Sequence, residues 1–426
     1  MNGPQPLPAG LNARLSFMMF LQYAIWGAWL PLFYSFLTEY RGFKGEDAGM
    51  LFSIGAIGAL AAPFIAGQIA DRWFNTERFL AISHLLGAAL VWQLADVENY
   101  SSFVVFGLLY SLIYAPTLPL TNSLAFHHLP DRDRDFGRVR VWGTVGWIAV
   151  GIGIGQWLLH RHTPAASVGP EAVRLAQVAG MADSFRLSGL LGALLGVYCL
   201  TLPKTPPQPG TQKFAPFEAL GEVRKMPLVA LFLVSFPIAC VHQFYFVHTA
   251  GFLGTLKHPA ADSINRVFGV GGGGLMTIGQ MAEIFVLAFM PLLARAMSRK
   301  TLLTIGLLAY IARFAVFAYA PVPAAVIPAL ALHGFVFGCF FFVCFMIVDE
   351  NTSKDVRASA QGLFNFVIVG LGTIVGNYFA GQVAGFAKAG GKTDYQLLFG
   401  VPMWICVACF AAHMLLYPRT PKAQAA

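Results

Sequence analysis

Apolar runs of about twenty residues alternate with short polar connections along almost the whole chain. Such a run is long enough to cross the ~30 Å hydrocarbon core of a bilayer, and in lipid it satisfies its backbone hydrogen bonds only as a helix. We therefore predict an all-α membrane protein. Its twelve predicted transmembrane helices are residues 14–38, 48–70, 79–96, 102–126, 139–159, 184–202, 228–254, 267–294, 301–319, 324–348, 358–384 and 395–417.

The longest polar stretch between two spans in mid-chain, residues 203–227, is rich in proline and polar residues, as linkers are. It leaves six predicted spans on either side. We predict an N-terminal six-helix bundle over residues 1–202, a cytoplasmic linker over 203–227, and a C-terminal six-helix bundle over 228–426. This layout is typical of transporters built from two repeated bundles. Two fused but unrelated six-helix units are the alternative.

The composition excludes a soluble domain, because 57% of the residues are hydrophobic and only 11% are charged, against roughly 25% charged in soluble domains. The net charge of +8 does not indicate a nucleic-acid partner, because the basic residues are scattered through short loops. With a cytoplasmic N-terminus, eighteen of the 28 Lys and Arg residues lie on the cytoplasmic side, nine lie opposite, and Arg313 lies within a span. The positive-inside rule then predicts that both termini are cytoplasmic.

The cysteines and histidines do not indicate a cofactor or metal site. All six cysteines lie in apolar runs, so we expect neither a disulfide framework nor redox chemistry at Cys406 and Cys409. The histidines at the membrane borders lack a set of Cys or carboxylate ligands at structural spacing. For His84, His242 and His248, a buried neutral ring is the first interpretation and a proton-relay role is the alternative.

Two polar side chains, Gln280 and Glu283, occupy the middle of the apolar run 275–293. Their spacing of three residues puts them on one helix face. A charged side chain at this depth costs about 2.5–3.5 kcal/mol on insertion scales, so intramembrane acids usually face a cavity, find a partner, and handle ions or substrate. We predict a functional role for Glu283. A protonated Glu that only holds helices together is the alternative.

The short segment after the second predicted span contains Gly67, Asp71 and Arg72 in the order G-x-x-x-D-R. This pattern resembles the loop between the second and third helices of the major facilitator superfamily. An acid and a base at helix ends can pair in one conformation and separate in another. We predict that Asp71 and Arg72 govern conformational switching; a loop that only obeys the positive-inside rule is the alternative.

Several longer strings resemble the bacterial nucleoside:proton symporter family of the major facilitator superfamily, in the same order through nearly the whole chain. They are QYAIWGAW at 22–29, YAPT at 114–117, RVWGTVGW at 140–147, QMAE at 280–283, RFAVFAY at 313–319 and RASAQG at 357–362.

The resemblance implies a nucleoside site between the two halves. Its implied substrate-binding residues are Arg140, Thr144, Trp147, Gln243, Gln280, Glu283, Phe337 and Phe341. A nucleoside offers a flat base that stacks on aromatic side chains and ribose hydroxyls that hydrogen-bond to amides and carboxylates. For each aromatic residue, a packing or lipid-facing role is the alternative, since the chain has 38 Phe. For Arg140 the alternative is a cytoplasmic topology anchor.

Two positions depart from the family pattern. Phe342 stands where the resemblance places an acid beside the tenth-helix aromatic, and Phe246 replaces a polar amide a turn beyond Gln243. Both changes make the pocket more apolar and leave Glu283 as the acidic side chain expected near mid-membrane. Glu283 is thus our candidate for proton coupling, and a uniporter in which it only accepts hydrogen bonds from ribose is the alternative.

The resemblance and the residues together predict a monomeric secondary transporter, not an enzyme, that imports nucleosides with protons across the bacterial inner membrane. A carrier for a sugar or another small polar metabolite is the nearest alternative. An intramembrane enzyme is disfavoured, because the sequence offers no paired-acid, zinc or serine site at membrane depth. A non-transporting sensor stays open.

Overall fold

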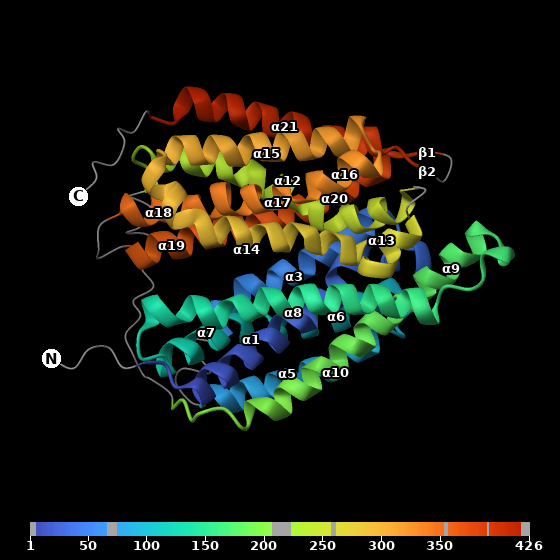
Figure 1. The fold of residues 1–426 in the computed structure, drawn as a ribbon, viewed down its shortest axis with the longest axis horizontal. Helices are drawn as coiled ribbons and strands as arrows, with labels where there is room; N and C mark the ends of the chain where they lie inside the picture. Colours follow the sequence, from blue (N-terminus) through green and yellow to red (C-terminus); the bar gives the residue numbers. More distant parts are fainter. Residues whose placement is uncertain are drawn as a thin grey trace. The chain divides into compact units, whose positions relative to one another are not determined.

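The computed structural model describes residues 6–65, 75–206, 223–256, 261–352, 357–389 and 392–418. These residues are helical apart from connections and one short antiparallel pair of strands, β1 (Lys388–Ala389) and β2 (Lys392–Thr393) (Figure 1). The all-α prediction is therefore confirmed for the part of the chain that the structure describes.

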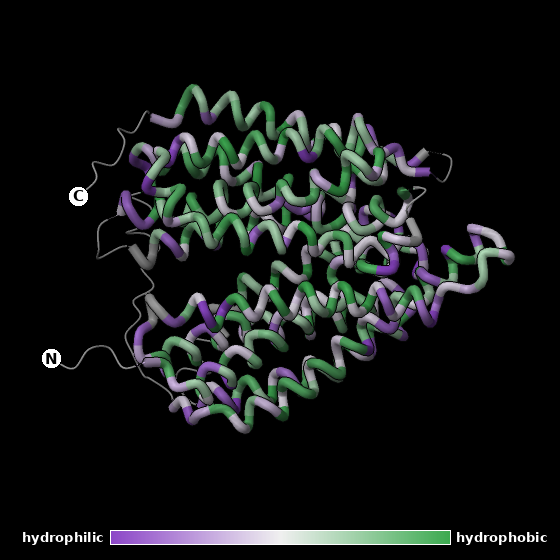
Figure 2. The backbone as a smooth tube through the Cα atoms, viewed as in Figure 1, coloured by the Kyte–Doolittle hydropathy of each residue, from purple (hydrophilic) through white to green (hydrophobic). Residues whose placement is uncertain are grey.

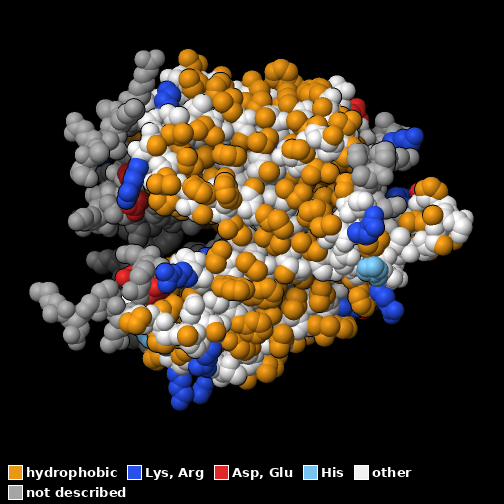
Figure 3. Space-filling model, in the orientation of Figure 1, with side chains coloured by type: hydrophobic (Ala, Val, Ile, Leu, Met, Phe, Trp, Pro, Cys, Tyr) orange, Lys and Arg blue, Asp and Glu red, His pale blue; other side chains and the backbone are white. Residues whose placement is uncertain are grey.

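Ten helical segments in the described ranges are long and apolar enough to cross a membrane. In Figure 2 the middle of most long helices is hydrophobic and the polar residues gather toward their ends. Figure 3 shows the matching surface, in which hydrophobic side chains cover most of the visible face of each unit. The ten segments are Ala9–Tyr40, Tyr100–His128, Asp135–Arg161, Pro170–Cys199, Leu228–Thr255, Gly273–Ala296, Arg299–Tyr319, Pro323–Glu350, Ala360–Phe386 and Tyr395–Leu416.

The other two predicted spans, 48–70 and 79–96, coincide with helices α3 and α5, which are not among those ten. Residues 66–70 of the first lie outside the described residues, and α5 begins with the charged pair Glu77 and Arg78. The twelve-helix count therefore stays a prediction.

The chain divides into two compact units, and the first comprises Met1–Thr211 with Ala260–Thr277. Helix α1 packs along α8 and α10, α5 packs against α10, and α3 against α6. The helices of this unit are α1 (Ala9–Trp29), α2 (Phe33–Ser35), α3 (Gly45–Ile65), α5 (Thr76–Leu94), α6 (Tyr100–Tyr114), α7 (Thr117–His128), α8 (Arg132–Arg161), α9 (Pro170–Gly180), α10 (Ala182–Cys199) and α13 (Ala261–Phe268).

Glycines set how closely α1 and α8 approach. A Cβ built on Gly146 of α8 would collide with the backbone carbonyl of Phe20 in α1, and a Cβ built on Gly27 of α1 would lie 3.0 Å from the Trp147 ring. Small residues at such contacts let membrane helices pack backbone against backbone. The glycines inside the α8 string RVWGTVGW thus position the residues of that string against α1.

A glycine-rich run, residues 269–272, leads into α14 (Gly273–Ala296). Gly269, Gly271 and Gly272 have φ values of 73°, 85° and 80°, which favour glycine. The amide of Val270 donates to the carbonyl of Gly155 in α8 at 3.0 Å. Residues 260–277 accordingly group with the first unit, although the predicted three-part division assigns them to the C-terminal bundle.

The second unit comprises Gln212–Pro259 and Ile278–Ala426. Helix α12 packs against α20 and α21, and α15 against α21. Two π-helical segments, Val336–Phe342 and Phe366–Leu371, interrupt long helices. Besides the rest of α14, this unit holds α12 (Leu228–Thr255), α15 (Arg299–Tyr319), α16 (Pro323–Leu330), α17 (Leu332–Phe335), α18 (Val343–Glu350), α19 (Arg357–Asn365), α20 (Gly372–Phe386) and α21 (Tyr395–Leu416).

Candidate functional site

Three predicted substrate residues, Arg140, Thr144 and Trp147, lie on one face of α8, because their spacings of four and three residues match the helical repeat. All three are half-buried. The Trp147 ring meets the edge of Trp26 of α1 at 5.9 Å between centroids. The first unit therefore presents one helix face that carries a cation, a hydroxyl and an aromatic ring.

Tyr23 of α1 holds the cationic end of this face. The guanidinium carbon of Arg140 lies 4.0 Å from the centre of the Tyr23 ring, within the range of a cation–π contact. Gly143 makes room for the pair, since a Cβ there would lie 2.6 Å from the Tyr23 ring and 2.9 Å from Arg140 Nη1. Tyr23 lies inside the matching string at 22–29 but was not among the residues predicted for the site.

A buried polar network lies beside this face. Gln22 Nε2 donates to Thr117 Oγ1 at 2.8 Å, and the Tyr114 hydroxyl donates to the Gln22 carbonyl at 2.6 Å. The remaining amide oxygen of Gln22 has no hydrogen-bond partner within the described part of the chain. These residues come from two of the family strings, and their bonds join α1 to the break between α6 and α7.

In the second unit, Gln280 and Glu283 occupy α14 as predicted, three residues apart. Gln280 is buried, and its side-chain oxygen has no hydrogen-bond partner among the described residues. The Glu283 side chain is 17% exposed, and its Oε2 lies 3.7 Å from His333 Nε2. The intramembrane acid is therefore held beside a histidine, which the sequence analysis did not single out.

His333 in turn contacts Arg313, which is fully buried in α15. Arg313 Nη1 lies 3.0 Å from His333 Nδ1, and its guanidinium carbon lies 4.3 Å from the centre of the Tyr245 ring. The Tyr245 ring also stacks on His333 at 4.7 Å. A signal was available in the sequence, because Arg313 and His333 are polar residues inside apolar runs.

His242 connects this cluster to the predicted aromatic residues. Its Nδ1 lies 2.7 Å from the Tyr310 hydroxyl, and its ring meets Phe341 at 4.9 Å between centroids. Phe341 and Phe337, 6.4 Å apart, both lie in the π-helical segment Val336–Phe342. Phe342, the residue where the resemblance implies an acid, is 40% exposed.

Gln243 hydrogen-bonds to a residue of its own unit. Its Nε2 donates to Thr373 Oγ1 at 3.3 Å, and Gly376 of α20 leaves space for it, since a Cβ there would lie 2.8 Å from Gln243 Cγ. One turn beyond, the Phe246 ring contacts His242 at 5.0 Å. His248 hydrogen-bonds to the Ala380 carbonyl at 3.0 Å and is buried, while its role stays a prediction.

Two predicted residues, Asp71 and Arg72, lie outside the described residues, so their switching role stays a prediction.

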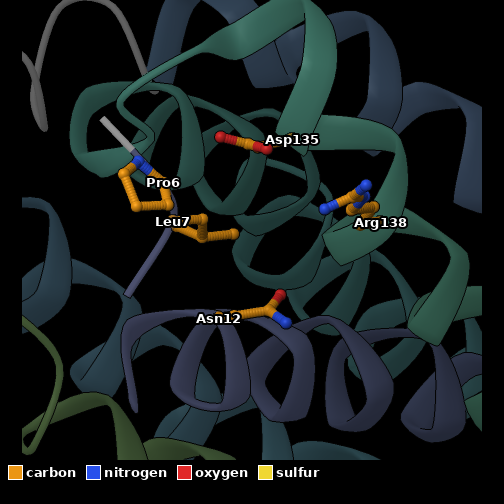
Figure 4. A pocket seen from close by; sticks show the side chains of 5 residues that line it. All are labelled: Pro6, Leu7, Asn12, Asp135 and Arg138. Carbon is orange, nitrogen blue, oxygen red and sulfur yellow. The ribbon is translucent and has the colours of Figure 1, made fainter. Parts of the chain in front are cut away.

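A pocket of the first unit lies near the start of α1 and α8 (Figure 4). It contains none of the predicted substrate residues and offers no aromatic side chain for a base. Its lining residues are Pro6, Leu7, Asn12, Asp135 and Arg138.

Comparison with known proteins decides the family. The family described as nucleoside H+ symporter matches residues 9–422. The chain belongs to this nucleoside H+ symporter family. The resemblance of the sequence strings is thus confirmed over almost the whole chain.

Individual relatives agree with this family. The chain is 32% identical to the putative nucleoside transporter YegT of Escherichia coli (strain K12) over 380 residues, which cover 87% of this chain and 84% of that protein. It is 29% identical to the xanthosine permease of the same organism, over 93% and 92% of the two chains. The crystal structure of the nucleoside transporter NupG matches with a TM-score of 0.83 and 26% identity, over 96% of this chain and all of that one.

Membership in the nucleoside H+ symporter family makes the chain a transporter and not an enzyme. The family assignment supports proton-coupled nucleoside import by a multi-pass protein of the inner membrane. The match to NupG gives the chain the major facilitator fold.

Proposed function

We propose that this chain imports nucleosides together with protons by alternating access, as a monomer with twelve transmembrane helices in two six-helix bundles and with both termini in the cytoplasm. The family match over residues 9–422 supports the substrate class. The observation that carries the mechanism is the carboxylate of Glu283, held at 3.7 Å from His333 in the middle of an apolar helix.

In this proposal the α8 face contributes Arg140 and Thr144 as polar partners and Trp147 as a stacking surface. Stacking a base on an aromatic side chain contributes about 1–3 kcal/mol. Half-burial of all three side chains fits a face that a ligand can reach.

The second unit contributes the amides Gln243 and Gln280, the carboxylate Glu283 and the aromatics Phe337 and Phe341. The buried side-chain oxygen of Gln280, which has no hydrogen-bond partner in the part of the chain that the structure describes, supports a role in binding, because such a group costs free energy until a donor reaches it. Ribose hydroxyls and base N–H groups are donors of this kind. Phe341 already packs against His242, so Phe337 is the freer of the two rings for stacking.

Glu283 carries the coupled proton in this proposal. A proton that binds to Glu283 from the outer side and leaves to the inner side drives accumulation, provided that the protonated and ionised forms favour different conformations. Phe342 at the family's second acidic position makes Glu283 the one acidic side chain that we assign to coupling.

Uptake into proteoliposomes tests the proposal. The purified protein is supplied with tritiated uridine, adenosine and xanthosine, with free bases and with sugars, with and without an inward proton gradient. We expect uptake of at least one nucleoside above its external concentration, only with the gradient, and competition by other nucleosides but not by ribose or maltose. Sugar transport without nucleoside transport would overturn the substrate class, and equal uptake without a gradient would favour a uniporter.

A further inference from the structure

A chain of three side chains from three helical segments runs through the interior of the second unit. It begins at Glu283 in α14, passes through His333 in α17, and ends at Arg313 in α15. His333 is 2% exposed and Arg313 is 0% exposed. The helices meet closely here, since a Cβ built on Gly334 would lie 2.9 Å from the Glu283 amide nitrogen.

The contact with Arg313 fixes which nitrogen of His333 carries the proton. A guanidinium group has only donors, so at a separation of 3.0 Å Arg313 Nη1 donates and His333 Nδ1 accepts. The proton of the neutral imidazole is then on Nε2, the nitrogen that lies 3.7 Å from Glu283 Oε2. A second proton on Nδ1 would point at the guanidinium group that already donates to this nitrogen.

The other titratable groups around His333 do not change this assignment. Helix α12 contributes His242, whose ring stacks on His333 at 5.7 Å. It also contributes Tyr245, whose ring stacks on His333 at 4.7 Å and which interacts with both Arg313 and Glu283. Helix α15 contributes Tyr310, whose hydroxyl is hydrogen-bonded to His242 Nδ1. Helix α21 contributes Cys406, which interacts electrostatically with Arg313.

We propose that His333 is a positioning residue for proton coupling: Arg313 locks it in the neutral form with its proton on Nε2, and this N–H group, 3.7 Å from Glu283 Oε2, stabilises the ionised carboxylate electrostatically. The proton that crosses the membrane binds to and leaves from a Glu283 oxygen, and His333 keeps its own proton throughout. This inference rests on the proposed coupling role of Glu283. His333 and Arg313, which lie outside the predicted site, would then control how readily Glu283 releases its proton.

A pair of substitutions separates this role from a proton relay and from packing. Gln at position 333 can accept from Arg313 through its oxygen and donate to Glu283 through its nitrogen, but it cannot titrate. Leu at position 333 removes both functions. We expect His333→Gln to keep proton-driven uptake and its pH profile. We expect His333→Leu to move the alkaline fall of uptake to higher pH by about one unit, a tenfold change in proton affinity, because the ionised carboxylate has lost a donor.

His248→Leu is the matched control, because it removes a buried histidine of the same unit that bonds to the Ala380 carbonyl. Its pH profile should stay that of the unaltered protein. Loss of coupling in His333→Gln would mean that His333 itself carries the proton, and an unmoved profile in His333→Leu would mean that it only packs. Either result overturns the proposal.

A spectroscopic measurement covers the case in which His333→Leu does not fold. Infrared difference spectra of the detergent-solubilised protein across pH report the carboxyl band that Glu283→Gln removes. The midpoint of this band should be the same in the unaltered protein and in His333→Gln, and a shifted midpoint would overturn the proposal. The proposed function fails separately, if the unaltered protein moves nucleoside without proton flux.

Discussion

The guanidinium group of Arg140 on α8 lies over the ring of Tyr23 on α1, with 4.0 Å between the guanidinium carbon and the ring centre. An aromatic face restricts where a planar cation can point, and the contact contributes about 0.5–2 kcal/mol depending on desolvation. Arg140 is therefore held in place by a neighbouring helix. An arginine that serves only as a topology anchor needs no such partner.

Arg140→Lys should reduce nucleoside uptake at least tenfold. Lysine keeps the charge but lacks the planar fork and stacks less well on Tyr23. The measurement is initial uptake in proteoliposomes at matched protein incorporation. Uptake close to that of the unaltered protein would favour the topology-anchor interpretation.

Tyr23→Leu should weaken substrate affinity about two- to thirtyfold, which corresponds to the ~0.5–2 kcal/mol of the lost contact. Tyr23→Phe is the control, because it keeps the ring and removes only the hydroxyl. Equilibrium binding of tritiated nucleoside to purified protein provides the measurement. Equal losses in both variants would place the effect in the hydroxyl and contradict the cation–π role.

Glu283→Gln should abolish accumulation against a gradient while keeping exchange of substrate between the two sides of a vesicle. The amide preserves the shape of the side chain and can still hydrogen-bond, but it cannot bind and release a proton. Proton flux with a pH-sensitive dye and counterflow with labelled nucleoside test the two parts separately. Undiminished accumulation in this variant would rule out coupling through Glu283.

Gly146→Ala should lower the thermal stability of the protein, because the new Cβ would collide with the Phe20 carbonyl across the contact between α1 and α8. Overpacking of this kind costs about 1–3 kcal/mol. Gly153→Ala in the same helix is the matched control, since no atom of the described residues lies within 4 Å of a Cβ there. Thermal unfolding in detergent should give a lower midpoint for Gly146→Ala than for Gly153→Ala. Equal midpoints would show that α1 and α8 can move apart without loss of stability.

Asp71→Asn should slow transport while leaving equilibrium binding of nucleoside close to normal, because the predicted position of Asp71 is at a helix end and not at the substrate residues. A rate measured by counterflow and an affinity measured on the purified protein distinguish the two effects. A large loss of affinity with a normal exchange rate would place Asp71 in the binding site instead.

The membrane class and the pair Gln280 and Glu283 could be predicted from the length of apolar runs and from spacing within one helix, whereas Arg140, Thr144 and Trp147 were expected from the family resemblance. Apolar run length sets the spans, and the intervals from Arg140 to Trp147 and from Gln280 to Glu283 put each set on one face. The strings at 140–147 and 280–283 then identified the family. Twelve spans were expected from the same rule; ten are found in the described ranges, and for α3 and α5 the expectation stays a prediction.

The partners across helices could not be predicted in this way. Nothing in the spacing of Glu283 in the eighth predicted span points to His333 in the tenth or Arg313 in the ninth. Their contact depends on how α14, α15 and α17 pack, which is decided by close approaches such as Gly334 against Ala282. Tyr23 was missed for the same reason, because its partner Arg140 is 117 residues later in the chain.

The π-helical segment Val336–Phe342 separates His333 from the residues that follow it. A wide turn of this kind holds an extra residue compared with an α-helical turn, and one residue in an α-helix corresponds to a rotation of about 100°. Deletion of a single residue within the segment would therefore turn α18 relative to His333 without breaking the helix. Such a deletion would change the direction of Phe341 and the residues after it relative to His333, so the aromatic residues that we propose for stacking and the histidine beside Glu283 can change independently of each other.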